Sequence, residues 1–210
     1  MVGDLNSKEL PATDEIPRDL DVRLRRSRVP GWVIVRQDNR SRAPSNRPGE
    51  DIFAERYLGG DEYTVFVGGY WDDSDQIWTL PPARRCFAES IPPEEHFLSY
   101  DRYWGYYEQE SGPSNGEPFY RYELVGGALS KELVKLASRA YFAVKGHGYA
   151  RVDIRRDTVN GKLSILEVNA NCGLSGDSET STGSILQLMG CRYSDLLARI
   201  LNQTLLRFKT

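Results

Sequence analysis

The stretch "GYARVDIRRDTVNGKLSILEVNANCG", residues 148–173, holds two short runs of alternating character separated by a turn. Both "YARVDIRR" at 149–156 and "KLSILEVN" at 162–169 place apolar and polar residues in turn, which is the period of a strand with one buried face. Asn160-Gly161 lies between them and is typical of a hairpin turn. The stretch therefore predicts an antiparallel hairpin.

The length of the turn decides which residues of the hairpin face one another. A two-residue turn at Asn160-Gly161 would place Asp153 and Glu167 on opposite faces. A three-residue loop that adds Val159, with Gly161 left-handed, gives a second register. Its pairs are Thr158 with Lys162, Ile154 with Leu166, Asp153 with Glu167, Val152 with Val168 and Arg151 with Asn169. We predict this second register, because it gathers the polar residues on one face and leaves the apolar ones for the core.

Two carboxylates that lie directly across a strand pair repel each other, because their Cβ atoms are only about 5 Å apart. A positive charge is therefore expected beside Asp153 and Glu167. Arg151 and Arg155 share their face and could supply it. A hard divalent cation such as Mg²⁺ could also supply it and would take Asn169 as a further oxygen ligand. The strand pattern leaves both explanations open.

The rest of the chain predicts short strands before the hairpin and helices around it. The expected strands are 31–35, 52–57 and 62–70, the expected turn-rich segment is 71–93, and the expected helices are 130–146, about 180–189 and 194–207. We expect the first helix to begin at Ser130 and end at Gly146. The last should begin at Ser194 and bury a stripe from Leu196 to Leu201. This order predicts the α+β class, with a mainly antiparallel sheet flanked by helices.

Two segments outside this pattern are candidates for other roles. Residues 96–122 hold nine aromatic residues interrupted by Gly, Pro, Ser and Asn, which predicts a long loop that either closes over a site or only packs on the core. Nine arginines lie between Arg18 and Arg47, against four acids up to Glu50. They could form an arm that binds nucleic acid, but the near absence of aromatic residues among them favours a solvated, poorly ordered segment.

Composition narrows the function classes. The net charge of −3 argues against a nucleic-acid partner. No apolar run reaches about 18 residues and no signal peptide is evident, so we expect a cytoplasmic protein without membrane contact. The three cysteines form no CxxC pair, which argues against a zinc site of the usual spacing. Cys172 is a candidate nucleophile, although no histidine lies near it in the sequence.

Two motifs together resemble the ATP-grasp superfamily, and most nearly the C-terminal part of D-alanine–D-alanine ligases. "GYARVDIRR…LSILEVNANCGLSGDS" follows the pattern G-x-x-R-x-D, hairpin, E-x-N-x-x-P-G-M-x-x-x-S, and "AERYLGGDEYTVFVGG" at 54–69 is similar to E-x-x-[IL]-x-G-x-E-[FY]-T-V. Their order and the helix between them make the match specific over residues 52 to about 205. The resemblance implies an ATP-grasp C-terminal lobe over 51–210.

The resemblance also implies chemistry for the polar face of the hairpin. The residues that match its magnesium ligands are Asp153, Glu167 and Asn169. Arg151 matches an arginine that contacts phosphate and the charge of the transition state. The implied reaction is an ATP-dependent ligation with two Mg²⁺ ions, in which a small-molecule carboxylate forms an acyl phosphate and an amine then displaces phosphate.

Further positions match the binding of nucleotide and substrate. The residues that match the adenine pocket are Glu55, Arg56 and Leu58. Glu62 matches the residue at the ribose hydroxyls. Gly173 matches a backbone amide of the oxyanion site, and Ser178 matches a serine that binds a substrate carboxylate.

The chain departs from the family pattern ahead of residue 50. There the family has a substrate-binding domain and a second lobe with phosphate-binding lysines and a glycine-rich flap. Here 1–50 is a polar, arginine-rich lead-in or a remnant of that lobe, in which "VIVRQ" at 33–37 is the strand most like it. Arg102-Tyr103 is a loose match to a Lys-Tyr pair of the closing loop, and Cys172 replaces a proline.

Three readings of function follow. The first is a carboxylate–amine ligase whose missing lobe is supplied by another chain or is truncated from the gene model. Its expected protein partner is a second chain that supplies the lobe or a further copy in a homo-oligomer. The second is a degenerate remnant that binds nucleotide or a protein partner without ligase activity. The third is a nucleic-acid-binding protein led by the basic arm.

Overall fold

The computed structural model describes two compact units of the chain. Its described residues are 25–26, 32–36, 52–98, 113 and 116–207. One unit comprises residues 1–57 and 92–112, and the other comprises residues 58–91 and 113–210.

The first unit contains a small antiparallel sheet in the order β1-β2-β3. Its strands are β1 (Arg25–Arg26), β2 (Trp32–Arg36) and β3 (Ile52–Arg56), and a short 3₁₀ helix, η2, spans Pro93–Glu95. The strands predicted at 31–35 and 52–57 are thus confirmed.

Several predictions concern residues outside the described part of the chain. They include most of the basic segment from Arg18 to Arg47, the Arg102-Tyr103 match, much of the aromatic segment 96–122, and the domain boundary at residue 50. These stay predictions.

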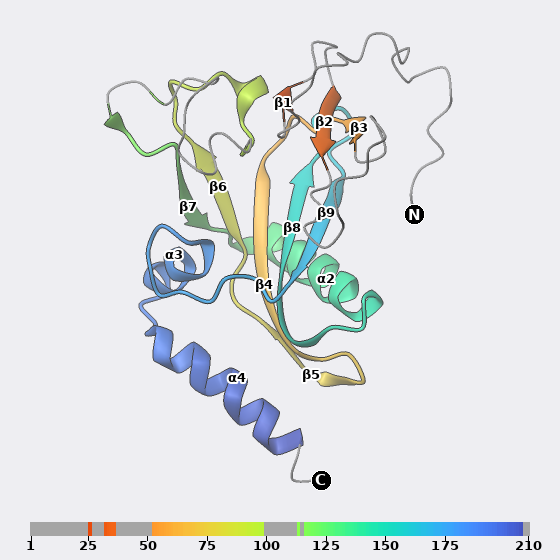
Figure 1. Cartoon of the computed structure of the whole chain (residues 1–210), viewed down its shortest axis with the longest axis vertical. Helices are drawn as coiled ribbons and strands as arrows, with labels where there is room; N and C mark the ends of the chain where they lie inside the picture. The colour runs from red at the N-terminus through yellow and green to blue at the C-terminus, as the bar shows by residue number, and fades with distance from the viewer. Residues whose placement is uncertain (1–24, 27–31, 37–51, 99–112, 114–115, 208–210) are drawn as a thin grey trace, which may run out of the picture. The chain divides into compact units, whose positions relative to one another are not determined.

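The second unit is built on an antiparallel sheet in the order β7-β6-β4-β8-β9, with β5 also paired to β4 (Figure 1). Its strands are β4 (Glu62–Tyr70), β5 (Asp73–Thr79), β6 (Ala83–Phe87), β7 (Tyr120–Leu124), β8 (His147–Arg156) and β9 (Leu163–Ala170). Its helices are α2 (Gly127–Ala143), α3 (Ser181–Leu188) and α4 (Tyr193–Arg207). The predicted α+β class and antiparallel sheet are confirmed. No described helix combines the length and hydropathy of a membrane-spanning segment.

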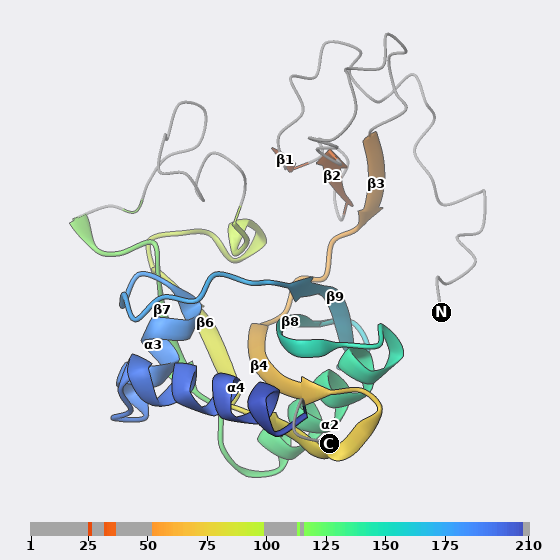
Figure 2. The same ribbon diagram turned by 60° about the horizontal axis from the view of Figure 1, so that its bottom comes forward.

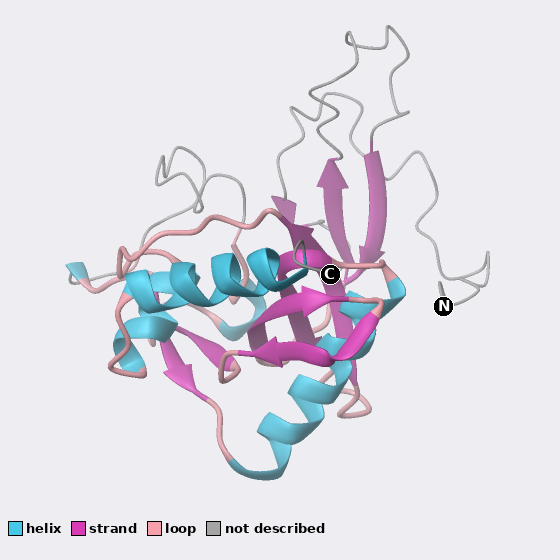
Figure 3. Ribbon diagram, turned by 90° about the horizontal axis from the view of Figure 1, so that it is seen from below, coloured by secondary structure: helices cyan, strands magenta, loops and turns pink. Residues whose placement is uncertain are grey.

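Strand alternation on β4 divides the core between the two faces of the sheet. Tyr63, Val65 and Val67 pack with Val152, Ile154 and the buried stripe of α2 on one face. Phe66 points to the other face and packs in a cluster with residues of α3 and α4. Figures 2 and 3 show α2 on the opposite side of the sheet from α4. The polar residues of β8 share the Phe66 face.

The sequence pattern missed three strands of this sheet. The segment 71–93 contains β5 and β6, although it was predicted as turns, and β7 lies at the end of the predicted aromatic loop. β5 reads "DSDQIWT" and β6 reads "ARRCF", so neither shows the alternation of a half-buried strand. Their pairing with β4 and with β7 supplies the stability that their own composition does not predict.

The predicted beginnings of two helices were wrong. Helix α2 begins at Gly127 rather than Ser130, and its cap residue is Gly126. Helix α4 begins at Tyr193 rather than Ser194, and the Asp195 carboxylate accepts the Arg192 backbone N–H at 3.3 Å. The stripe of α4 is also shorter than predicted: Leu196 is buried, whereas Leu201 is exposed.

Gly146 ends α2 in a different way from the prediction. The left-handed residue is Lys145, with φ of 55°, and the last helical residue is Ala143. The N–H groups of Lys145 and Gly146 donate to the carbonyls of Phe142 and Tyr141, at 3.0 and 2.9 Å. This is the bond pattern of a Schellman motif. Gly146 is needed for space instead, because a Cβ there would lie 2.2 Å from the Tyr141 ring.

Candidate functional site

The pairing of β8 with β9 creates the polar face. Arg151 lies opposite Asn169, and Asp153 lies opposite Glu167, so the predicted register is confirmed at these pairs. On its other side β8 pairs with β4, which places Thr64 beside Asp153. All five side chains therefore lie on one face of three adjacent strands.

The loop of the hairpin differs from the prediction, although the register at the polar pairs is the predicted one. The Asp157 N–H donates to the Lys162 carbonyl at 2.8 Å, so the loop has four residues, Thr158 to Gly161, and the predicted pair of Thr158 with Lys162 was wrong. Gly161 is left-handed as predicted, with φ of 71°. Ile154 pairs with Ile165 rather than Leu166, and the register shifts between Asp153 and Ile154.

The shift makes Leu166 the extra residue of a β-bulge. Four loop residues move the pairing by one position from the predicted register, and the bulge moves it back before the polar pairs begin. Leu166 is consequently 46% exposed and does not lie in the core as predicted. Val168 is partly buried and packs against the core, as predicted.

The Asp153 carboxylate is buried and accepts hydrogen bonds from three side chains. Arg151 donates to both oxygens, with Nε to Oδ1 at 2.9 Å and Nη2 to Oδ2 at 2.8 Å. Asn169 Nδ2 donates to Oδ2 at 2.9 Å, and Thr64 Oγ1 donates to Oδ1 at 2.9 Å. Glu167, by contrast, is exposed.

Arg151 supplies the positive charge beside Asp153. Burial favours the neutral form of its guanidinium, but the hydrogen bonds to Asp153 and the negative charge of that residue outweigh burial and raise the pKa of Arg151. Arg155, the second arginine of the prediction, turns instead to Glu62, with Nη1 to Oε2 at 3.2 Å. Of the two arginines expected to offset the carboxylates, Arg151 pairs with Asp153 and Arg155 does not.

The donor set also fits a hard cation. Asp153 and Glu167 supply carboxylates from adjacent strands, and Asn169 would supply oxygen if its amide turned over. Among the described residues no group of three or more His, Cys, Asp or Glu side chains gathers. The candidate metal site therefore consists of two carboxylates and one amide.

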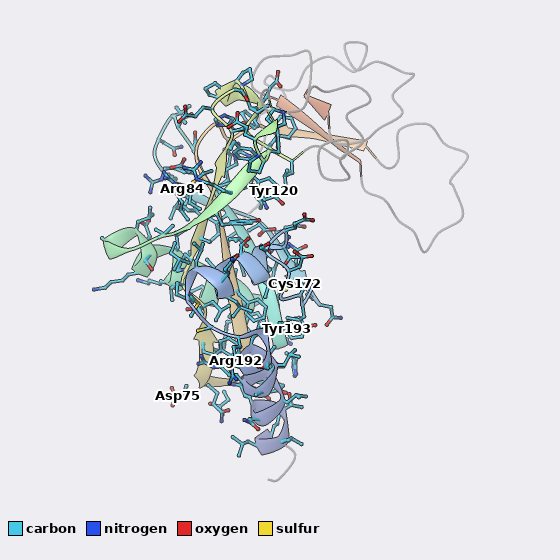
Figure 4. The ribbon with its side chains drawn as sticks, turned by 90° about the vertical axis from the view of Figure 1, so that its left-hand side faces the viewer. Asp75, Arg84, Tyr120, Cys172, Arg192 and Tyr193 are labelled. Atoms are coloured by element: carbon cyan, nitrogen blue, oxygen red, sulfur yellow. The ribbon has the colours of Figure 1, made fainter. Side chains whose placement is uncertain are left out.

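The segment after β9 is held against α3 and α4. Asn171 takes a left-handed conformation, with φ of 54°, and Cys172 then enters the core cluster of this face. Tyr193 donates its hydroxyl to the Leu174 carbonyl at 3.1 Å, and Figure 4 shows Cys172 and Tyr193 labelled in this region. Burial raises the pKa of the Cys172 thiol to about 11. A buried, protonated thiol is a poor nucleophile, so the geometry argues against a catalytic Cys172.

Gly173 and Ser178 lie at the two ends of the loop that leads into α3. Gly173 is exposed, and its carbonyl accepts the Thr182 hydroxyl at 3.2 Å. Ser178 is also exposed, and its carbonyl accepts the Ser184 hydroxyl at 2.5 Å. Thr180 caps α3 by accepting the Gly183 N–H at 3.0 Å. The loop thus offers the Gly173 backbone and the Ser178 side chain to solvent.

The residues that match the nucleotide-binding positions of the family differ in whether the structure describes their side chains and in how deeply they are buried. The side chains of Glu55 and Arg56, on β3, lie outside the described residues, and Leu58 is partly buried. Glu62 lies on β4, on the same face as Asp153, but it is buried and paired with Arg85 and Arg155.

Sequence reasoning missed two participants of this face, Thr64 and Arg85. Thr64 could have been found, because Glu62 and Thr64 are polar alternates on an apolar strand in the same way as Glu167 and Asn169. Arg85 gave no such signal, because its segment reads as turns.

Comparison with known proteins agrees with this fold. The model of the D-ala D-ala ligase C-terminus family matches residues 45–202. A D-alanine–D-alanine ligase from Halorhodospira halophila is 32% identical over 159 residues, which cover 74% of this chain and 43% of the relative.

Solved structures agree at the level of the fold. A D-alanine–D-alanine ligase from Bacillus anthracis complexed with ATP aligns with a TM-score of 0.50 and 21% identity, covering 75% of this chain and 42% of that one. A second structure of the Bacillus anthracis ligase aligns with a TM-score of 0.50 and 24% identity, covering 75% and 44%. The chain spans less than half the length of these relatives. By sequence and by fold, it belongs to the D-ala D-ala ligase C-terminus family.

Proposed function

We propose that this chain forms the nucleotide- and magnesium-binding part of an ATP-dependent carboxylate–amine ligase. The observation that carries the proposal is the register of β8 and β9, which sets Asp153 against Glu167 and Arg151 against Asn169 on one face. Membership of the ligase C-terminus family supports the same assignment.

Four polar residues of the face would each have a task in this reaction. Asp153, Glu167 and Asn169 would hold magnesium, which shields the phosphate charge from an incoming carboxylate. If a cation became the partner of Asp153 in place of Arg151, the Arg151 guanidinium would be available to phosphate oxygens.

The exposed loop before α3 would bind the substrates of the two reaction steps. A carboxylate oxygen of one substrate bonds to the γ-phosphorus of ATP and ADP leaves, which gives an acyl phosphate. The amine of the other substrate then attacks the acyl carbon, phosphate leaves, and the amine loses a proton as the amide forms. The Gly173 N–H would donate to the oxygen that gains charge, and the Ser178 hydroxyl would bind a substrate carboxylate.

A thermal-shift titration of the full chain with ATP and Mg²⁺ tests the proposal. We expect stabilisation of about 2.7 kcal/mol at a hundredfold excess over Kd. Asp153→Asn and Glu167→Gln should each weaken the apparent affinity at least about tenfold, because each removes one anionic ligand. Glu132→Gln, an exposed change on α2, is the matched control and should leave the response unchanged. A wild-type chain that ATP and Mg²⁺ do not stabilise would contradict the proposal.

One observation favours a second candidate, a remnant that binds nucleotide or a protein partner without ligation. Three protein side chains already satisfy Asp153, so the face is stable without any ligand. Phosphate release from ATP with a panel of amino acids separates the two. Release that depends on the amino acid identifies a ligase, and stabilisation by ATP without release identifies the remnant.

A further inference from the structure

Thr64 is a buried polar residue of the central strand β4. Its side chain is only 2% exposed, and β4 is buried along its whole length. Thr64 Oγ1 donates to Asp153 Oδ1 at 2.9 Å, and the two residues pair directly across β4 and β8. A hydroxyl at this depth needs a hydrogen-bond partner, and among the described residues the Asp153 carboxylate supplies it.

The three side chains that donate to Asp153 approach it from different sides. Thr64 comes from β4, on one side of β8, whereas Asn169 comes from β9, on the other side. Glu167, the second carboxylate of the candidate metal site, also lies on β9. Arg151 lies on β8 itself. The two residues proposed to hold magnesium together with Asp153 are therefore on the strand away from Thr64.

This placement separates Thr64 from the other two donors when a cation binds. Under the proposed function, Arg151 would leave Asp153 and the Asn169 amide would turn over to supply oxygen, so neither would still donate to Asp153. The Thr64 bond requires no such change, because it reaches Asp153 from β4. It is the bond of the three that would still hold the buried carboxylate in one orientation. Thr64 is itself rigid, because branching at Cβ restricts its χ1 angle and β4 packs on both faces.

The orientation of a carboxylate matters more for Mg²⁺ than for Ca²⁺. Mg²⁺ requires nearly ideal octahedral geometry, whereas Ca²⁺ accepts flexible geometry and carboxylates that bind through one oxygen or both. A carboxylate that can turn therefore loses more affinity for Mg²⁺ than for Ca²⁺. We propose that Thr64 is a positioning residue that holds Asp153 in place for Mg²⁺ and thereby makes the site prefer Mg²⁺ to Ca²⁺. The inference rests on the proposed function, which assigns the cation to Asp153, Glu167 and Asn169.

The test measures the affinity of the full chain for MgATP and for CaATP by calorimetric titration. Thr64→Val keeps the shape of the side chain and removes its hydroxyl, whereas Thr64→Ser keeps the hydroxyl. Thr64→Val should weaken the binding of MgATP about tenfold, as expected for the loss of one hydrogen bond to a charged group, and that of CaATP less than about threefold. Thr64→Ser should keep the ratio of the two affinities within about twofold of the wild type. Both complexes carry ATP, so the ratio cancels the contribution of the nucleotide.

A matched control and a stability measurement separate positioning from a purely structural role. Thr79, on β5, is partly buried and pairs with Val67 of the same strand β4. Thr79→Val should leave both affinities unchanged. Urea unfolding of the free protein shows whether Thr64→Val also lowers stability. A purely structural Thr64 would lower the urea midpoint and weaken both complexes by the same factor. Thr64→Ala replaces Thr64→Val if the valine variant does not fold.

The outcomes distinguish failure of this inference from failure of the proposed function. A wild type that binds MgATP no more tightly than CaATP overturns the inference and leaves the proposed function intact. Equal effects of Thr64→Val on the two complexes, or a loss that Thr64→Ser shares, also overturn it. Loss of the fold in both Thr64→Val and Thr64→Ala assigns the residue to stability and overturns it as well. A wild type that binds neither complex overturns the proposed function itself.

Discussion

Asp153 is a buried carboxylate whose oxygens are satisfied by neighbouring side chains. Arg151, Asn169 and Thr64 together satisfy its oxygens in the protein alone. A buried carboxylate without such donors would raise the free energy of the fold by several kcal/mol, so these bonds stabilise the fold. Under the proposed function, a cation would take the place of Arg151 beside Asp153 and would need the Asn169 amide to turn over.

The three cysteines should differ in their reactivity. Burial raises the pKa of the Cys172 thiol to about 11 from a usual 9.0, whereas Cys191 is exposed. At pH 8 iodoacetamide should modify Cys191 well before Cys172, because only the thiolate reacts. The sign of the shift also makes Cys172 a source of stability below about pH 9 that is lost as the pH rises through about 11.

Peptide mapping by mass spectrometry after timed alkylation measures these rates, and urea-unfolded protein serves as the control in which the two thiols react alike. Rapid modification of Cys172 in folded protein at pH 8 would show that the thiol is activated.

Gly146 is the residue whose replacement should most disturb the end of α2. Gly146→Ala would bring a Cβ to 2.2 Å from the ring of the buried Tyr141, whose hydroxyl donates to the Gly69 carbonyl at 2.8 Å. The ring cannot move without breaking this bond, so we expect a loss of about 2–3 kcal/mol in the free energy of unfolding. Gly126→Ser, at the other end of the helix in open space, is the comparison and should be neutral or slightly stabilising. Urea unfolding of both variants measures the difference, and equal midpoints would contradict the packing argument.

At the scale of the element, the β8–β9 hairpin combines a loop and a bulge that offset each other. The four-residue loop and the bulge at Leu166 each change the pairing by one position. The result is that Asp153 still faces Glu167. Bulges commonly re-aim side chains next to functional sites, and here the bulge brings the polar residues of β9 opposite those of β8.

The bulge predicts that substitutions at two nearby apolar residues of β9 differ in their cost to stability. Leu166→Thr should change the free energy of unfolding by less than about 0.5 kcal/mol, because Leu166 is exposed. Val168→Thr should cost about 1–2 kcal/mol, because it places a hydroxyl against the core of the α2 face. Chemical denaturation measures both. A larger cost at Leu166 than at Val168 would contradict the bulge, because it would show that the Leu166 side chain is buried.

At the scale of the whole molecule, each of the two compact units has its own sheet, and the candidate site lies in the second. There the central strand β4 contributes apolar side chains to both faces, to α2 on one side and to α3 and α4 on the other. Helix α4 is attached to the sheet by polar bonds near its end: Tyr70 to Thr204 at 3.0 Å, Trp78 to Gln203 at 2.8 Å, and Arg207 to Asp72 at 2.7 Å. These bonds link the last helix to the hairpin of β4 and β5.

The attachment of α4 should depend on pH through Asp72. The hydrogen bonds from Arg207 lower the pKa of Asp72 below its usual 3.8. A lowered pKa means that the stabilising effect is present above about pH 4 and is lost as the pH falls further. Asp72→Asn should therefore lower Tm at pH 7, and the difference from wild type should shrink at pH 2.5.

Asp75→Asn, an exposed change in the same hairpin, is the control for this comparison. A difference between wild type and Asp72→Asn that is equal at both pH values would show that the ionised carboxylate is not the cause.

The sequence by itself predicted the hairpin, the facing pairs Asp153–Glu167 and Arg151–Asn169, and the antiparallel α+β class. It could do so because the two-residue period of a half-buried strand and the spacing of polar alternates are local properties of the chain. The same reasoning overlooked β5 and β6, whose composition carries no such period, and it placed β7 at the end of the aromatic loop although "YRYEL" alternates.

Only the tertiary structure decided how the polar residues are used. The bulge at Leu166, the bonds from Arg151 to Asp153 and the burial of Glu62 between two arginines all depend on residues from other strands. A side chain chooses its partner by what the assembled sheet brings within hydrogen-bonding distance, and a pattern along one strand cannot contain that information. The residue types of the face were therefore determined by the sequence, and their pairing was determined by the fold.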